Sequence, residues 1–404
     1  MRPFSGAVLL REMLALARCG VRAEVARVQV GAGYLALALG CLCWEGAGTT
    51  AAQQLHVAEG CYPAKLSSFS DPATPFWSSE TMVAESVLMI SDGVGTPHGA
   101  LLWPSVEILS VQDALLERDY ERGKDWDYDP KAGELFLTSG SAAPWMKTSD
   151  LVAGGEPLFK EGHFFQSQQL AVTYRHAPGL WKGPMPGESN KLASTLAKLK
   201  ARSAVELVVY GDSISFGYNA SGFSTADIEV ISPLMQPWAS LVACQIKARY
   251  GAEVKLVNAS EAGRVSAWGR ERVQALVSVN KPDLVVIGFG MNDGSQGVSP
   301  SDFEANLLAM MDSVRVANPA AEFILVSPML ANPSWKVAGD QRRYASVFER
   351  LSGRPGVAVA DVTSAHVELL KRKAYVDMTG NGVNHPNDFL IRWYAQLVGD
   401  LLGI

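Results

Sequence analysis

The sequence predicts an α/β fold: a three-layer parallel sheet with helices on both faces, preceded by a smaller all-β domain of sandwich type. Two observations lead to this prediction. From about residue 201 to the end, short apolar strand-like runs alternate with helical stretches, as in βαβ units. Between residues 81 and 180, short β-type runs recur and are separated by turn clusters.

Composition and charge exclude some classes of function. The chain has 404 residues, 48% of them apolar, which is enough for a large core and predicts more than one domain. The net charge is −6, so the chain lacks the broad basic field with which proteins bind nucleic acid. A neutral or sugar-like substrate is compatible with this balance.

Residues 1–52 have the pattern of an export signal or a membrane anchor. Arginines precede a charge-free stretch over residues 28–44, and small residues follow, as before a signal cleavage site. The true start could lie downstream, for example at Met13. An uncleaved anchor and a lipid-modified Cys41 stay open as alternatives. The expected location is periplasmic or extracellular, with or without attachment to a membrane.

The following segments divide at changes of composition. Residues 53–80, rich in Ser, Pro and Ala, are expected to form an extension or linker. Residues 81–180 form the predicted all-β domain, and residues 181–200 a second linker opened by Pro and Gly. The strands expected in the all-β domain cover residues 86–90, 106–111, 134–137 and 170–174.

Residues 201–404 form the predicted parallel-sheet domain. Because its strands are apolar throughout, helices should cover both faces of the sheet. The strands are expected at residues 207–210, 254–258, 284–289, 322–327 and 357–361. The helices are expected at residues 193–202, 238–250, 269–279, 301–317, 340–350 and 389–402.

Four short polar islands in this domain hold the candidate functional residues. Ser213, Gly263 and Asn292 each follow the end of a strand, where ligands of open parallel sheets bind. His385 lies in a loop rich in Pro, Asn and Gly before the last helix. A serine, a backbone N–H, a side-chain amide and a histidine are the nucleophile, two oxyanion donors and base of a serine esterase.

The order of these islands resembles the SGNH (GDSL-like) hydrolase family, which is named for the Ser, Gly, Asn and His of its four blocks. The chain matches them at Ser213, Gly263, Asn292 and His385, from about residue 203 to the end. The resemblance implies a flavodoxin-like sheet, a Ser213 nucleophile and a His385 base. It also implies that Gly263 and Asn292 donate hydrogen bonds to the oxyanion. It implies no metal or other cofactor.

Each candidate also has an ordinary structural interpretation. Ser213 could cap a helix, Gly263 could serve only a turn, and Asn292 could be a plain loop residue. Asp293 is expected to hold its loop rather than to react. Of the six histidines, only His385 lies where the family places its base. The four blocks in order favour the catalytic interpretation.

The chain departs from the family at the catalytic acid. The family's aspartate lies three residues before the histidine, and Gly382 occupies that position. A backbone carbonyl, Asp377 and Asp388 are the candidates for the group that orients His385. A carbonyl would suffice, because the third member of a triad mainly fixes the tautomer and stabilises the imidazolium. Asp388 is expected to cap the last helix instead.

Cys61 and Cys244 are the two cysteines beyond the leader. We expect two unpaired thiols, because the cysteines fall in different predicted segments, and keep one disulfide as the alternative in an oxidising compartment. No cysteine spacing indicates a metal site. Two glycosylation-type triplets, at Asn219 and Asn258, overlap the family's blocks and are interpreted as structural.

The sequence therefore predicts an exported serine ester hydrolase that forms an acyl-enzyme on Ser213. A β domain before such a hydrolase resembles certain carbohydrate esterases, which implies O-deacetylation of polysaccharides. A lipase, thioesterase or general esterase is the second hypothesis, and a catalytically weak carbohydrate-binding envelope protein the third. The expected partner is an acetylated saccharide or another small ester, and a membrane only if the leader is retained or lipidated.

Four tryptophans in or near the N-terminal region could stack on sugar rings. Most of them are expected to be core residues instead. They are Trp103, Trp126, Trp145 and Trp181.

Overall fold

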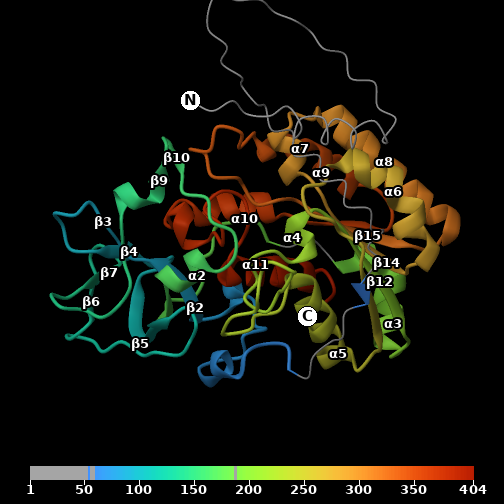
Figure 1. Cartoon of the computed structure of the whole chain (residues 1–404). Helices are drawn as coiled ribbons and strands as arrows, with labels where there is room; N and C mark the ends of the chain where they lie inside the picture. The colour runs from blue at the N-terminus through green and yellow to red at the C-terminus, as the bar shows by residue number, and fades with distance from the viewer. Residues whose placement is uncertain (1–52, 55–59, 186–188) are drawn as a thin grey trace, which may run out of the picture. The chain divides into compact units, whose positions relative to one another are not determined.

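The computed structural model describes residues 53–54, 60–185 and 189–404 (Figure 1). The predicted export signal or anchor, residues 1–52, lies outside them. Among the described residues, no helix has the length and apolar character needed to cross a membrane. Every element below belongs to one compact unit, within Thr50–Ile404.

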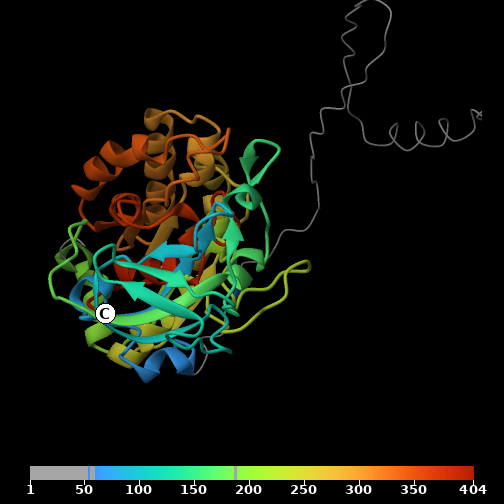
Figure 2. The same cartoon turned by 90° about the vertical axis from the view of Figure 1, so that its left-hand side faces the viewer.

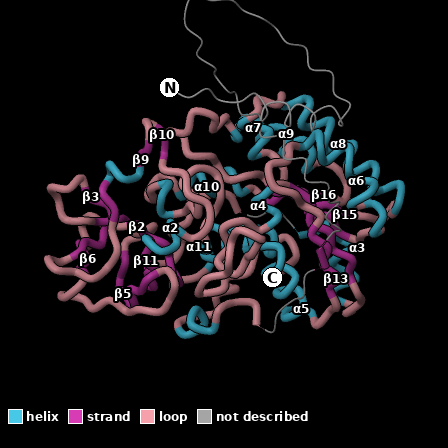
Figure 3. Tube along the Cα trace, viewed as in Figure 1, coloured by secondary structure: helices cyan, strands magenta, loops and turns pink. Residues whose placement is uncertain are grey.

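The C-terminal part is built on a six-stranded sheet, whose five parallel strands lie close to the positions that the alternating pattern predicts (Figure 3). Its order is β1-β13-β12-β14-β15-β16, which places the first parallel strand, β12, between β13 and β14. Such a reversal of strand order is where ligands bind in open α/β sheets. The parallel strands are β12 (Val205–Gly211), β13 (Val254–Asn258), β14 (Leu284–Gly288), β15 (Glu322–Val326) and β16 (Val357–Ala360). The short β1 (Gln53–Gln54) pairs antiparallel with the edge of β13.

Helices cover both faces of this sheet, so the predicted three-layer α/β class is confirmed. The long helices lie close to their expected positions, whereas the short α4, α7 and α10 were not expected. The helices are α3 (Ala193–Lys200), α4 (Ser213–Phe216), α5 (Trp238–Tyr250), α6 (Ser266–Leu276), α7 (Met291–Ser295), α8 (Pro300–Ala317), α9 (Ala345–Ser352), α10 (Val362–Leu369) and α11 (Asp388–Asp400).

Side chains of β12 alternate between two hydrophobic clusters, because successive residues of a strand face opposite sides. Val208 and Tyr210 pack in the cluster that includes residues of α6, α8 and α9. Leu207 and Val209 pack in the cluster that includes residues of α3, α5, α10 and α11. The apolar run of this strand is therefore explained by burial on both faces.

The N-terminal part is rich in β-strands, as predicted (Figure 2), and its strands are mostly antiparallel, although β3 and β8 pair in parallel. A three-stranded sheet has the order β2-β11-β5, and a five-stranded sheet the order β6-β7-β4-β3-β8. The strands are β2 (Thr81–Leu88), β3 (Ile90–Ser91), β4 (His98–Ala100), β5 (Ser105–Asp113), β6 (Trp126–Asp129), β7 (Glu134–Leu137), β8 (Met146–Lys147), β9 (Val152–Ala153), β10 (Glu156–Pro157) and β11 (Gln169–His176). One short helix, α2 (Phe164–Gln168), leads into β11.

The β-rich part packs directly against the parallel-sheet part. One hydrophobic cluster contains Val172 of β11, Trp393 of α11 and Val209 of β12. Helix α11 contacts β2 of the β-rich part and also β16 and α5 of the parallel-sheet part. The apolar core is therefore continuous across the two parts, and the domain boundaries proposed from the sequence stay a prediction.

The four tryptophans are placed differently from one another. Trp103 and Trp126 are buried in the core, as expected for most of them. Trp181 packs on Trp393 of α11, with 4.7 Å between the ring centroids. Trp145 is exposed.

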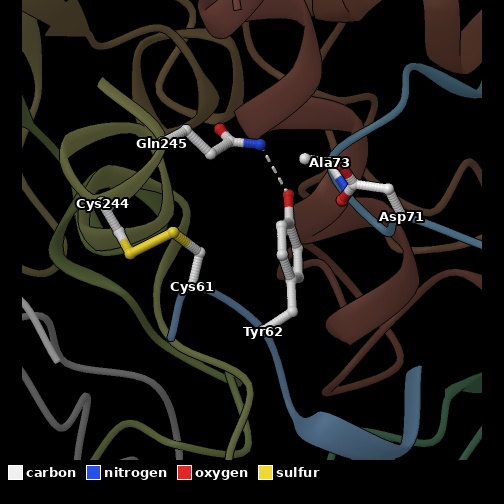
Figure 4. Close-up of a disulfide and its surroundings, with 6 residues drawn as sticks. All are labelled: Cys61, Tyr62, Asp71, Ala73, Cys244 and Gln245. Carbon is white, nitrogen blue, oxygen red and sulfur yellow. Dashed lines mark hydrogen bonds between the residues drawn. A yellow bond between two sulfur atoms is a disulfide. The ribbon is translucent and has the colours of Figure 1, made fainter. Parts of the chain in front are cut away.

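The expectation of two unpaired thiols is wrong, because Cys61 and Cys244 form a disulfide (Figure 4). Their Cα atoms are 5.4 Å apart, within the usual range for a bridge. The segment that carries Cys61 lies along α5, and Gln245 Nε2 donates to the hydroxyl of Tyr62 at 2.9 Å. Further along, Phe76 packs on Trp393 with ring centroids 5.1 Å apart. Sequence distance between the cysteines therefore did not reflect their spatial distance.

Candidate active site

Ser213 lies at a tight turn between β12 and α4. Asp212 caps α4, and its carboxylate accepts a hydrogen bond from the backbone N–H of Ile214 at 3.0 Å. The Gly211 position must be glycine, because a Cβ there would lie 2.3 Å from the carbonyl oxygen of Gly288 on β14. The serine side chain is almost buried, with 4% of the residue exposed.

His385 faces Ser213 across the carboxyl edge of the sheet. Its Nε2 lies 2.8 Å from Ser213 Oγ, which is hydrogen-bond distance. The loop of His385 is shaped by Asn381, whose side-chain oxygen accepts hydrogen bonds from the backbone N–H groups of Val383, Asn384 and His385. This loop precedes α11, as the sequence predicts.

Two side-chain oxygens meet the other ring nitrogen of His385. Asn219 Oδ1 lies 2.8 Å from Nδ1, and Glu161 Oε1 lies 3.2 Å from it. Asn219 follows the Gly-Asp-Ser turn and could have been suspected from its place in that block. Glu161 belongs to the loop between β10 and α2 of the β-rich part, and no local pattern marks it.

The sequence-based proposals for the group that orients His385 are therefore wrong. Asp377 instead accepts hydrogen bonds from the backbone N–H groups of Leu88 and Ala374. Asp388 accepts from the Ser221 N–H at 2.9 Å and from Gln166 Nε2 at 3.0 Å. Both carboxyl groups are buried and engaged elsewhere, and the Nδ1 partners are side chains rather than a backbone carbonyl.

Asp388 also does not cap α11. That role belongs to Asn387, whose side-chain oxygen accepts from the Leu390 N–H. Burial raises the pKa of Asp388 from 3.8 to about 6, against the lowering effect of its hydrogen bonds from Ser221 and Gln166. It is a buried structural acid of the first turn.

The loops of Gly263 and Asn292 are tied to the strand ends beside Ser213. The Glu261 N–H donates to the Gly211 carbonyl at 3.1 Å, which joins the first loop to β12. Asn292 lies in α7, and its Nδ2 donates to the Arg264 carbonyl at 3.0 Å. One amide hydrogen of Asn292 is used in this way, and an amide nitrogen carries two. Gly263 has φ +74°, a left-handed conformation that favours glycine.

Asp293 holds the two loops together, as expected. Its carboxylate accepts from the N–H and the hydroxyl of Ser266, the first residue of α6. The same hydroxyl accepts from Asn306 Nδ2 of α8 at 3.0 Å. This anchor explains why α6 begins three residues before the position expected from the sequence. Burial raises the pKa of Asp293 above its ordinary value, against these hydrogen bonds.

Asp212, next to Ser213, is also a buried acid. Burial raises its pKa from 3.8 to about 7, against hydrogen bonds from the backbone N–H groups of Ile214, Ser215 and Met291. These bonds join the turn of Ser213 to α7, which carries Asn292.

Aromatic side chains lie beside the histidine. The ring of Tyr218 is 5.4 Å from that of His385. Phe216 and Phe223 pack against Tyr218 with ring centroids 6.0 and 5.4 Å away. All three rings are half-buried, so part of this cluster faces solvent next to the base.

The arrangement is suited to acyl transfer. It brings together a serine hydroxyl, an imidazole in contact with it, two oxygens behind the imidazole and nearby N–H donors. Within the described part of the chain, no group of three or more His, Cys, Asp or Glu residues could hold a metal ion.

Comparisons with known proteins show the family of the chain. Residues 209–389 match the model of the GDSL-like lipase/acylhydrolase family. The chain is 34% identical over 151 residues to esterase TesA of Pseudomonas aeruginosa, a match that covers 37% of this chain and spans only 65% of that relative's length. It is 30% identical over 202 residues to an arylesterase of Vibrio mimicus, covering 50% of this chain and 90% of the relative.

A solved structure is similar in part. It is a two-domain esterase active on acetylated mannans, with 20% sequence identity and a TM-score of 0.43. The similarity covers 54% of this chain and 54% of that one.

Proposed function

Because the chain belongs to the GDSL-like lipase/acylhydrolase family, we propose that it hydrolyses carboxylic esters through an acyl-enzyme on Ser213. The observation that carries the proposal is the 2.8 Å contact between Ser213 Oγ and His385 Nε2. A serine hydroxyl is a poor nucleophile at neutral pH until a base removes its proton.

In the first half of the reaction, His385 Nε2 takes the proton of the Ser213 hydroxyl while Oγ attacks the ester carbonyl. The tetrahedral intermediate collapses as the protonated His385 donates that proton to the departing alcohol. In the second half, His385 removes a proton from water, which attacks the acyl-enzyme. Collapse of the second intermediate returns the proton to Ser213 and releases the acid.

The negative oxygen of each intermediate needs hydrogen-bond donors that are already in place. We assign this role to the Gly263 N–H and to the second amide hydrogen of Asn292. The bond from Asn292 to the Arg264 carbonyl fixes the orientation of the amide next to Gly263.

The proposed substrate is an O-acetylated saccharide. The half-buried Tyr218 offers a flat aromatic face beside His385 on which a sugar ring can stack. Polar side chains lie in the loop of Gly263, where Glu261 and Arg264 form an ion pair next to the exposed glycine. Sugars combine apolar ring faces with hydroxyl groups. An aromatic ring can pack on the first, and polar side chains can form hydrogen bonds with the second.

A general esterase or thioesterase is the second candidate, favoured by the identity to esterase TesA and to an arylesterase. A lipase falls in the same group. A carbohydrate-binding protein with an inactive hydrolase part is disfavoured, because His385 and Ser213 are within hydrogen-bond distance of each other.

We also propose that the protein is exported, to the periplasm or the cell exterior. The disulfide between Cys61 and Cys244 supports this proposal, because structural disulfides persist mainly in oxidising compartments.

The test is acetate release from acetylated xylan and mannan, run beside nitrophenyl esters of increasing acyl length. We expect acetate release and a preference for short acyl groups. Ser213→Ala should abolish all turnover and keep the fold. Ser215→Ala is the matched control, because its hydroxyl only donates to the Gly288 carbonyl at 3.2 Å. A preference for long acyl groups would favour the second candidate, and no turnover of any ester would overturn both.

A further inference from the structure

We infer that Glu161, from the loop between β10 and α2, is the carboxylate that positions His385 and stabilises its protonated form. The inference rests on the proposed function and names a positioning residue for it. Glu161 Oε1 lies 3.2 Å from Nδ1 of His385, and Ser213 Oγ lies 2.8 Å from its Nε2. The two groups therefore contact opposite sides of the imidazole. The β-rich part would thus supply a member of the catalytic triad.

Gly382 shows why the acid comes from elsewhere. Its φ is +91°, which disfavours aspartate, and a Cβ there would lie 2.0 Å from the carbonyl oxygen of Leu158. Leu158 precedes Glu161 by three residues in the same loop. The loop that brings Glu161 to the histidine therefore also fills the space that an aspartate at 382 would need.

This loop is held in place on both sides of Glu161. The Lys160 N–H donates to the Asn381 carbonyl at 3.0 Å. Asn219 Nδ2 donates to the Gly162 carbonyl at 2.8 Å, and His163 Nε2 lies 2.5 Å from the Glu229 carbonyl. Hydrogen bonds of Lys160, Gly162 and His163, on either side of Glu161, fix its position without help from the catalytic histidine.

The carboxylate itself is aligned by the residue that shapes the histidine loop. Asn381 Nδ2 donates to Glu161 Oε1 at 2.9 Å, while Asn381 Oδ1 accepts from the His385 N–H at 3.1 Å. Burial alone would raise the pKa of Glu161. This effect is outweighed by the hydrogen bond and charge of His385 and by the amides of Asn381 and Asn219. Together they hold the pKa of Glu161 below its ordinary value. The group is therefore ionised at neutral pH.

Asn219 and Glu161 have separate tasks at Nδ1. The Asn219 amide nitrogen donates to the carbonyls of Gly162 and Gly380, which leaves Oδ1 facing the imidazole. This neutral oxygen accepts the Nδ1 proton and, together with Glu161 Oε1 at 3.2 Å, fixes the tautomer and the orientation of the ring. The carboxylate adds the negative charge that favours imidazolium when the Ser213 proton reaches Nε2. No proton passes to Glu161.

The test compares Glu161→Gln with the parent on one ester, over a range of pH. We expect kcat to fall roughly 10- to 100-fold, with the Michaelis constant nearly unchanged, because the charge acts on the developing imidazolium. The acid limb of the kcat profile should move to lower pH, because loss of the carboxylate disfavours protonated imidazole. Glu161→Asp should restore part of kcat and of the parent profile.

Glu156→Gln is the matched control, since this carboxylate lies just before the same loop and pairs with Lys336 at 2.6 Å. It should keep the parent kcat and profile. Two outcomes would overturn the inference: Glu161→Gln behaving like this control, which would leave Asn219 as the sole orienting group, or a raised Michaelis constant at unchanged kcat. An inactive parent indistinguishable from Ser213→Ala would instead reject the proposed function.

Discussion

Lys373 Nζ lies 2.7 Å from Glu85 Oε1, and both side chains are completely buried. Asp377 is a second carboxylate near the ammonium, at 3.4 Å. Burial opposes the charge of Lys373, but the two carboxylates outweigh it and raise the pKa of the lysine. Tyr174 of β11 donates to Glu85 at 2.6 Å. The ammonium thus joins β2 and β11 of the β-rich part to the loop after α10.

Lys373→Met should lower the free energy of unfolding by about 3–5 kcal/mol, because removing one partner leaves buried charges without compensation. Urea denaturation measures this change. Lys371→Met is the control, since its pair with Glu368 is largely exposed on the lysine side and worth at most about 1 kcal/mol. Equal losses in the two variants would contradict the assignment.

Reduction of the disulfide between Cys61 and Cys244 should lower the melting temperature. The bridge spans 183 residues, and closing so long a loop stabilises the fold by up to about 5 kcal/mol in the chain-entropy model. Thermal unfolding with and without dithiothreitol measures the effect. A double Cys→Ser variant should melt at the lower temperature and not respond to reductant; a response equal to the parent's would contradict the pairing.

Asn292→Ala should lower kcat by roughly 100-fold or more, the usual cost of losing an oxyanion donor. The Michaelis constant should change little, because the donor acts on charge that develops in the transition state. Steady-state kinetics separate the two constants. Asn280→Ala, which removes a remote amide bonded to the Leu276 carbonyl, is the control. Unchanged kcat with a raised Michaelis constant would mean that Asn292 only binds substrate.

Asp388→Asn should retain most esterase activity and change how stability depends on pH. In the folded protein the pKa of Asp388 is about 6, against an ordinary 3.8, so the folded state binds more protons between these values. Its contribution to the free energy of unfolding is about 3 kcal/mol. That contribution is fully present below pH 4 and is lost as the pH rises through 6.

Asp388→Asn has no ionisable group at this position, so it lacks this pH-dependent loss of stability. The unfolding free energy of the parent, measured from pH 3.5 to 7.5, should fall relative to that of Asp388→Asn. Parallel curves would contradict a raised pKa. A loss of activity as complete as that of His385→Ala would mean that Asp388 takes part in catalysis.

The sequence by itself determined the parallel sheet and the edge at which the candidate residues gather. The apolar run Leu207–Tyr210 is a local signal, because burial on both faces of a strand leaves no polar position. The strand-end positions of Ser213, Gly263 and Asn292 then follow from topology, since carboxyl ends of parallel strands share one edge.

Only the tertiary structure decided which groups meet across long sequence distances. Gly382 showed that the usual acid is missing, but not that Glu161 of the β-rich part lies 3.2 Å from His385. The bridge between Cys61 and Cys244 was misjudged for the same reason. Local periodicity records which face of an element is buried. It does not record which distant loop packs there, because that depends on the shapes of two surfaces that form only when the whole chain folds.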